Sequence, residues 1–245
     1  MSVMEILLLV GVVVFITHTL EAVTGFGCTV LAFPFVIFLM KDLEQAKIVL
    51  SILAWLLAVY FVVAKFGLVN WKQFGIIILF AGLGMPIGMV IFKSLDAHIL
   101  EKALGVFIVI SAAIQLFKCF VPASITRTLP NFIGYLFLFA GGIVHGALAV
   151  GGPLVVLYSA GKISDKGQFR ATMCLLWSTL NSILMIQFFF EKKLTMEIGR
   201  DLPVLLLFLI AGIFAGEAIH KKINEALFKK IVFISLFLVG VAMIL

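Results

Sequence analysis

The sequence predicts an all-α, polytopic membrane protein built from two repeats. Of its 245 residues, 64% are hydrophobic and only 12% are charged, and the mean hydropathy is +1.28. Such a composition is too apolar for a water-soluble domain of this length. Apolar runs of about 18 residues or more suit helices that cross a bilayer, whereas a membrane β-barrel would alternate apolar and polar residues. We therefore expect one integral membrane domain over residues 1–245.

The charges give no sign of a nucleic-acid partner. The net charge of +6 comes from Lys and Arg residues that are scattered over the short loops instead of forming a patch. Loop charge of this kind sets the orientation of membrane segments. The three cysteines lie in or beside apolar segments and lack paired spacing, so no metal site, disulfide framework or cofactor is expected. The N-terminus lacks a basic region and a cleavage site, which indicates a retained membrane segment.

The first apolar segment is too long for one straight span. Residues 6–40 would form a helix of about 50 Å at 1.5 Å per residue, which exceeds the hydrocarbon core. We expect this segment to break at the cluster Thr24-Gly25-Phe26-Gly27, because glycine weakens a helix and lets the backbone turn. Three cleaner spans follow at about residues 48–64, 74–92 and 100–117, each bounded by loops that contain Lys.

The pattern then starts again after a linker. Residues 120–130 carry two prolines and little hydrophobic periodicity, so they divide the chain near its midpoint. Residues 132–160 form a second long segment, interrupted by glycines from Gly146 to Gly152, and spans follow at about 171–190, 202–219 and 227–245. Two repeats are therefore expected, at about residues 5–119 and 131–245, each with one glycine-broken segment and three clean transmembrane helices.

Individual residues repeat as well as hydropathy. The matched pairs are Gly84 and Gly212, Gly88 and Gly216, Gly27 and Gly151, and Glu21 and His145. The first two pairs form Gly-xxx-Gly faces, which predict close helix packing. Inverted and parallel repeats place equal numbers of Lys and Arg residues inside, so the positive-inside rule does not choose between them. The net charge of the loops favours inverted repeats with both termini outside.

Three ionisable side chains lie at membrane depth, where a charge costs about 2.5–3.5 kcal/mol on insertion scales. His18 and Glu21 share one helix face just before the first break, and His145 precedes the second break. We interpret them as a proton relay or a substrate-contacting cluster. The alternative is that these groups lie near the membrane interface and are hydrated.

Glycine-flanked helix ends suit a small anion, because they expose unpaired N–H groups at the positive end of a helix dipole. This argument selects five backbone contacts: Thr24, Gly25, Gly27, Gly151 and Gly152. Asn181 lies on an unusually polar span and either lines the pathway or joins helices. Arg170 either draws anions toward the site or anchors its span at the membrane surface.

Enzyme motifs are missing from the sequence. It contains no His-Glu-x-x-His, no Gly-x-Ser-x-Gly, no Walker loop and no thiol cluster. We therefore expect a transporter of small anions in the lipid bilayer and not an enzyme. An anion channel and a structural or lipid-organising membrane protein remain as alternatives, and so does assembly into a homo-oligomer.

These motifs resemble a known family. The two four-segment halves, the Gly25-x-Gly27 break that ends at Ala32-Phe33-Pro34, the run from Gly146 to Pro153, and the Gly-xxx-Gly repeats at Gly84 and Gly212 are similar to those of the TauE/SafE sulfite exporters. The resemblance implies a multi-pass permease of the inner membrane of a bacterium or archaeon. It further implies outward transport of sulfite, organosulfonates or related sulfur compounds, coupled to the proton gradient.

Overall fold

A computed structural model describes residues 2–120 and 130–220, together with positions 234, 237, 241 and 244. Most of the predicted linker 120–130 and of the predicted span 227–245 lies outside these residues. The described part of the chain folds into nine α-helices and one short 3-10 helix, as the sequence predicts for the fold class. Six of these helices are long and apolar enough to cross a membrane.

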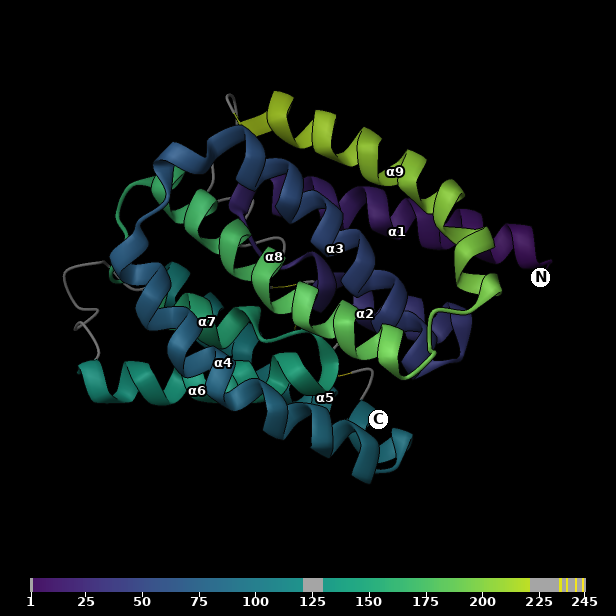
Figure 1. The fold of residues 1–245 in the computed structure, drawn as a ribbon, viewed down its shortest axis with the longest axis horizontal. Helices are drawn as coiled ribbons and strands as arrows, with labels where there is room; N and C mark the ends of the chain where they lie inside the picture. The colour runs from purple at the N-terminus through teal and green to yellow at the C-terminus, as the bar shows by residue number, and fades with distance from the viewer. Residues whose placement is uncertain are drawn as a thin grey trace.

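The first long segment breaks at the expected glycines. Helix α1 (Val3–Thr24) ends at Gly25, whose φ of 84° is left-handed, and α2 (Cys28–Met40) starts after Gly27, whose φ is 103°. Glycine adopts such angles without the steric cost that a Cβ brings. Figure 1 shows α2 turning back from the end of α1, so the two helices form a hairpin.

The first half continues with three long helices, and each is longer than its predicted span. They are α3 (Leu43–Lys65), α4 (Trp71–Ser94) and α5 (Ala97–Phe120), with the 3-10 helix η1 (Phe66–Leu68) after α3. Helix α3 starts five residues before the predicted boundary because Asp42 caps it, accepting a hydrogen bond from the Gln45 N–H. Lys47 therefore lies inside the helix and not in a loop.

The second half repeats this order. Helix α6 (Asn131–Leu148) is followed by a short turn and by α7 (Gly152–Ser159), and the long helices α8 (Lys166–Phe190) and α9 (Met196–His220) come next. Helices α1 and α6 run in opposite directions on two sides of the molecule, with α3 and α8 packed together between them (Figure 1). The second predicted break is thus also present, between Leu148 and Gly152.

Close contacts cross between the two halves. Helix α4 packs most extensively against α6, and α1 packs most extensively against α9. A Cβ on Gly84 or Gly88 would overlap the α6 backbone, and one on Gly216 would overlap Ala22 of α1. The predicted close packing of these Gly-xxx-Gly faces is confirmed, since helices approach this closely only where no side chain intervenes.

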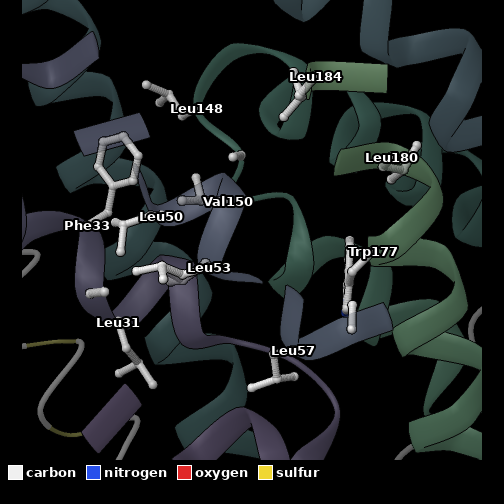
Figure 2. Packing of buried hydrophobic residues seen from close by; sticks show 14 of the residues in the cluster. Leu31, Phe33, Leu50, Leu53, Leu57, Leu148, Val150, Trp177, Leu180 and Leu184 are labelled. Atoms are coloured by element: carbon white, nitrogen blue, oxygen red, sulfur yellow. The ribbon is translucent and has the colours of Figure 1, made fainter. Parts of the chain in front are cut away.

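Most of the bundle interior is apolar. Figure 2 shows side chains from α2 (Leu31, Phe33), α3 (Leu50, Leu53, Leu57), α8 (Trp177, Leu180, Leu184) and the end of α6 with its following turn (Leu148, Val150). Many large apolar side chains are also exposed on the outside, Phe38 and Phe190 among them. An outer surface of this kind fits contact with lipid and not with water.

Candidate functional site

A small buried cavity lies where the two helix breaks approach each other. It is lined by residues of α1, α2, α3, α6, α7, α8 and the turn before α7: Glu21, Gly27, Thr29, Val30, Ala54, His145, Ala149, Val150, Gly152, Trp177 and Asn181. About 20 Å³ is open to the centre of a water-sized sphere, which is enough for a water molecule.

The two helices that begin at this cavity, like α6, have no side-chain cap. Helices α1, α3, α4 and α8 each begin with a side chain that accepts a hydrogen bond from the first turn. Helices α2 and α7 begin at Gly27 and Gly151, which have no side chain to do this. Gly27 and Gly152 line the cavity, so the positive dipole ends of α2 and α7 lie beside it.

Glu21 supplies part of the missing cap. Its carboxylate Oε2 accepts a hydrogen bond of 2.8 Å from the backbone N–H of Cys28, the first residue of α2. Glu21 is 3% exposed, and its carboxylate occupies the position where an external anion would meet this helix end. An anion and the ionised Glu21 therefore compete for the same backbone donor.

His145 and Asn181 bring unpaired polar atoms to the cavity. Both are buried, and neither ring nitrogen of His145 nor Oδ1 of Asn181 has a hydrogen-bond partner. Buried polar atoms without a partner cost free energy and call for an explanation. A ligand or a water molecule in the cavity would satisfy them.

Trp177 connects the two breaks. Its indole Nε1–H donates a hydrogen bond of 3.0 Å to the Gly25 carbonyl, and its ring stacks on the His145 imidazole. The Gly25 N–H is itself bonded to the Glu21 carbonyl oxygen at 2.7 Å. Gly25 therefore closes α1 and accepts a hydrogen bond from Trp177. The sequence predicts that its N–H contacts an anion, but this N–H is already bonded within α1.

The other predicted site residues lie outside the cavity lining. Thr24 donates its hydroxyl hydrogen bond to carbonyls of its own turn, at Leu20 and Phe26. A Cβ on Gly151 would overlap the Gly141 carbonyl oxygen, so this glycine allows α7 to pack on α6. His18 is fully buried, and its Nδ1 lies 2.9 Å from the Val14 carbonyl oxygen.

Arg170 joins helices instead of facing the cavity. The guanidinium donates a hydrogen bond of 2.8 Å to the Ala22 carbonyl near the end of α1. Its Nη2 also lies 3.1 Å from Oε1 of Glu217 on α9, which makes an ion pair. The angles of this contact do not meet those of a hydrogen bond, so Glu217 Oε1 has no hydrogen-bond partner. Its Cζ also lies 4.5 Å from the centroid of the Phe61 ring. Arg170 thus holds α1, α8 and α9 together.

Sequence reasoning did not select several residues near the site. Thr29, Val30, Ala54, Ala149 and Val150 line the cavity but carry no distinctive pattern. Trp177 also lines the cavity and was not selected, although the sequence offers a signal for it: it is a large aromatic residue within the polar stretch of α8. Lys47 is the larger omission: it is 1% exposed and donates a hydrogen bond of 2.9 Å to the Gly146 carbonyl, directly after His145.

No metal centre emerges from the described residues, in which no group of three or more His, Cys, Asp or Glu side chains could hold an ion. The chemistry of the cavity is that of hydrogen-bond donors, one carboxylate and one imidazole. These groups can bind an anion and exchange protons, and they show no arrangement of a nucleophile with a base.

Comparisons with known proteins agree with this chemistry. Searches of curated proteins and of solved structures found no significant match. The model of the family described as Sulfite exporter TauE/SafE matches residues 9–243, which is almost the whole chain. This family consists of membrane transporters for sulfite and related sulfur compounds. The protein therefore belongs to the TauE/SafE family of sulfite exporters.

Proposed function

We propose that the chain transports a small sulfur oxyanion, such as sulfite or an organosulfonate, through the cavity between the two helix breaks. One observation carries this proposal. Gly27 and Gly152, at two helix N-termini without side-chain caps of their own, line the same small cavity as His145, whose two ring nitrogens have no hydrogen-bond partner. Backbone N–H groups and an imidazole N–H are donors that suit an oxyanion without placing a full positive charge in the apolar core, whereas the unpaired Asn181 Oδ1 is an acceptor.

Two inverted repeats, residues 5–119 and 131–245, form the transport pathway in this proposal. The arrangement of the described helices supports inverted repeats. Helices α1 and α6 run in opposite directions, and each packs against the long helix that occupies the fourth place in the other half: α1 against α9, and α6 against α4 (Figure 1). Transporters with inverted repeats bind their substrates near the membrane midplane, between discontinuous helices. The membrane is the inner membrane of a bacterium or archaeon.

Glu21 couples the anion to a proton. The ionised carboxylate accepts a hydrogen bond from the Cys28 N–H and repels an incoming anion. The protonated carboxyl group accepts this hydrogen bond more weakly and repels the anion less. Anion binding therefore favours proton uptake at Glu21, which is a thermodynamic linkage between the two ligands. His145 lines the same cavity and donates to the anion when protonated. His18, about one turn before Glu21 on α1, is the further member of this proposed relay; it lies outside the cavity lining, and its Nε2 has no hydrogen-bond partner.

The experiment is flux of sulfite and of sulfoacetate into proteoliposomes, with and without a pH gradient. Wild-type protein accumulates one of these anions against its concentration gradient when a pH gradient is applied, which a channel cannot do. Glu21→Gln retains the acceptor for the Cys28 N–H but cannot titrate, so its flux no longer responds to the pH gradient. His145→Ala lowers flux about tenfold or more, as expected for a lost charge-assisted hydrogen bond.

Matched controls are available on the surface. Glu197→Gln and His98→Ala change the same residue types at exposed positions, and both keep wild-type flux. A Glu21→Gln variant that responds to the gradient as the wild type does would remove the coupling role. Absence of flux for every small anion would reject the transport proposal.

A further inference from the structure

A second, larger cavity of about 740 Å³ lies at the end of the molecule where α2 and α4 end and α3 begins. We call it the vestibule. Its wall includes six charged residues, Lys41, Asp42, Glu44, Lys93, Glu191 and Lys193. Lys93 pairs with Glu191, and Lys193 pairs with Glu44 at 2.9 Å. Most of the positive charge on this wall is thus already compensated by carboxylates.

Lys47 lies just behind the vestibule. Its Nζ is 3.8 Å from the centroid of the Phe92 ring, and Phe92 is part of the vestibule wall. The lysine is almost completely buried, and in the described part of the chain no carboxylate lies within ion-pair distance of it. The Phe92 ring therefore lies between the Lys47 amine and the vestibule.

The other side of Lys47 faces the candidate site. Its ammonium donates to the Gly146 carbonyl, and the preceding residue, His145, lines the cavity between the breaks. An ammonium group has three donors, and this bond uses one of them. Lys47 is thus placed between the vestibule and the cavity with donors left for a ligand.

We propose that Lys47 contacts the transported anion on its path between the vestibule and the cavity, and that the Phe92 ring is the partition that moves aside. This inference rests on the proposed function. A ring held over the ammonium by a cation–π contact is exchanged for an oxyanion, which binds the same cation more strongly in an apolar site. The ligand class is a singly or doubly charged sulfur oxyanion.

A different role must be distinguished, because Gly146 lies in the last turn of α6. A lysine at a helix C-terminus stabilises the helix by bonding its free carbonyls. In that case Lys47 variants would lower stability without any specific effect on the anion. The test therefore needs a readout of anion contact that does not depend on transport.

Chemical acetylation provides a readout of anion contact that does not depend on transport. The full-length protein in detergent is treated with a sulfonated N-hydroxysuccinimide ester of acetic acid, and acetylation of Lys47 is measured by mass spectrometry. The amine forms an amide bond with the acetyl group, while N-hydroxysulfosuccinimide leaves and a proton is released. Wild-type Lys47 reacts slowly because it is buried, and Phe92→Ala makes it react several-fold faster. Sulfoacetate slows this reaction more than chloride at equal ionic strength. Equal rates in the two proteins, or equal protection by both salts, would overturn the proposal.

Transport measurements complete the test. Lys47→Gln raises the KM for sulfite or sulfoacetate about tenfold or more, and Lys47→Arg restores part of the loss because it keeps the charge. Lys72→Gln, at an exposed position in the first turn of α4, keeps the wild-type KM. If the wild type transports and Lys47→Gln has an unchanged KM, only this inference fails. If the wild type transports no anion, the proposed function fails, while the acetylation result still reports on Lys47.

Discussion

The imidazole of His145 stacks on the indole of Trp177, with ring centroids 5.6 Å apart and planes inclined by 26°. The same indole donates its hydrogen bond to the Gly25 carbonyl. One side chain of α8 thus contacts the last turn of α6 and the turn that follows α1. The positions of the two breaks relative to each other depend on Trp177.

Replacing Trp177 by Phe keeps an aromatic ring but removes the donor. The Gly25 carbonyl loses its partner, which costs about 1–3 kcal/mol for a buried group, and His145 loses part of its stacking surface. We expect a lower Tm in detergent and a lower anion flux. Trp55→Phe loses a comparable hydrogen bond, to Ser182, and serves as the control. Equal loss of flux in both variants would show that Trp177 has no special role in positioning the breaks.

Substitution by alanine should destabilise the protein to different extents at the two glycines of the first break. Both have positive φ, so alanine at either position is strained by about 1–2 kcal/mol. At Gly25 the new Cβ would also lie 2.9 Å from the Arg170 Cα, whereas at Gly27 it meets nothing within 4 Å. Gly25→Ala should therefore lower the Tm more than Gly27→Ala. Equal Tm values would contradict this distinction.

Helix α4 offers a matched pair of glycines for the contact with α6. Gly88→Leu places a side chain against the Ile143 carbonyl and the Ala147 N–H, and rigid backbone cannot give way. Gly82→Leu points into open space, so the same substitution is tolerated. We expect Gly88→Leu to lose the monodisperse peak in detergent gel filtration and Gly82→Leu to retain it. Folding of Gly88→Leu with wild-type Tm would mean that α4 and α6 do not pack this closely.

Arg170→Met tests the junction of α1, α8 and α9. The Ala22 carbonyl and Glu217 lose a charged donor, which costs about 1.5–3 kcal/mol. Arg170→Lys keeps the charge but not the planar fork, so its Tm should lie between those of Arg170→Met and the wild type. Arg200 is exposed and lies 3.6 Å from the Asp201 carboxylate, so Arg200→Met should lower the Tm less than Arg170→Met does. A wild-type Tm in Arg170→Met would exclude a joining role.

The vestibule ion pairs predict a pH dependence of stability. Burial alone would raise the pKa of the Glu191 carboxyl, but hydrogen bonds from Lys93 and Gln187 and the charge of Lys193 hold that pKa below its ordinary value. A lowered folded-state pKa contributes stability above the unfolded pKa of about 4.3, and the contribution is lost as pH falls through the folded-state value. The hydrogen bond to Glu44 raises the pKa of Lys193, so that pair stays intact at neutral pH.

Lys93→Met should therefore lower stability at pH 7 by about 0.2–1 kcal/mol, as measured for exposed pairs. The difference in Tm between this variant and the wild type should shrink as the pH is lowered below about 4. Lys65→Met, at an exposed position near the opposite end of α3, is the control. A difference in Tm that stays constant from pH 7 to pH 3 would contradict the role of Glu191.

The helix breaks were predictable because glycine clusters interrupt apolar runs that are too long for one span. Glu21, Gly27, His145, Gly152 and Asn181 could be selected because polar or small residues stand out in such runs, and all five line the cavity. The partners of Arg170 could not be predicted, since Ala22 is 148 residues away. The sequence predicts a span that starts only at about residue 48, so it places Lys47 in the preceding loop, because lysine usually marks a membrane surface. Its acceptor, Gly146, lies 99 residues further along the chain.

The crossed packing of the helices has a consequence for biosynthesis. Helix α1 leaves the ribosome first, but its most extensive contact is with α9, which begins only at Met196. Until then the Thr19 and Ala22 side of α1, where Gly212 and Gly216 will pack, must face lipid or another protein of the insertion machinery. The first break, together with Glu21, therefore acquires its final surroundings only after α9 has been translated and inserted.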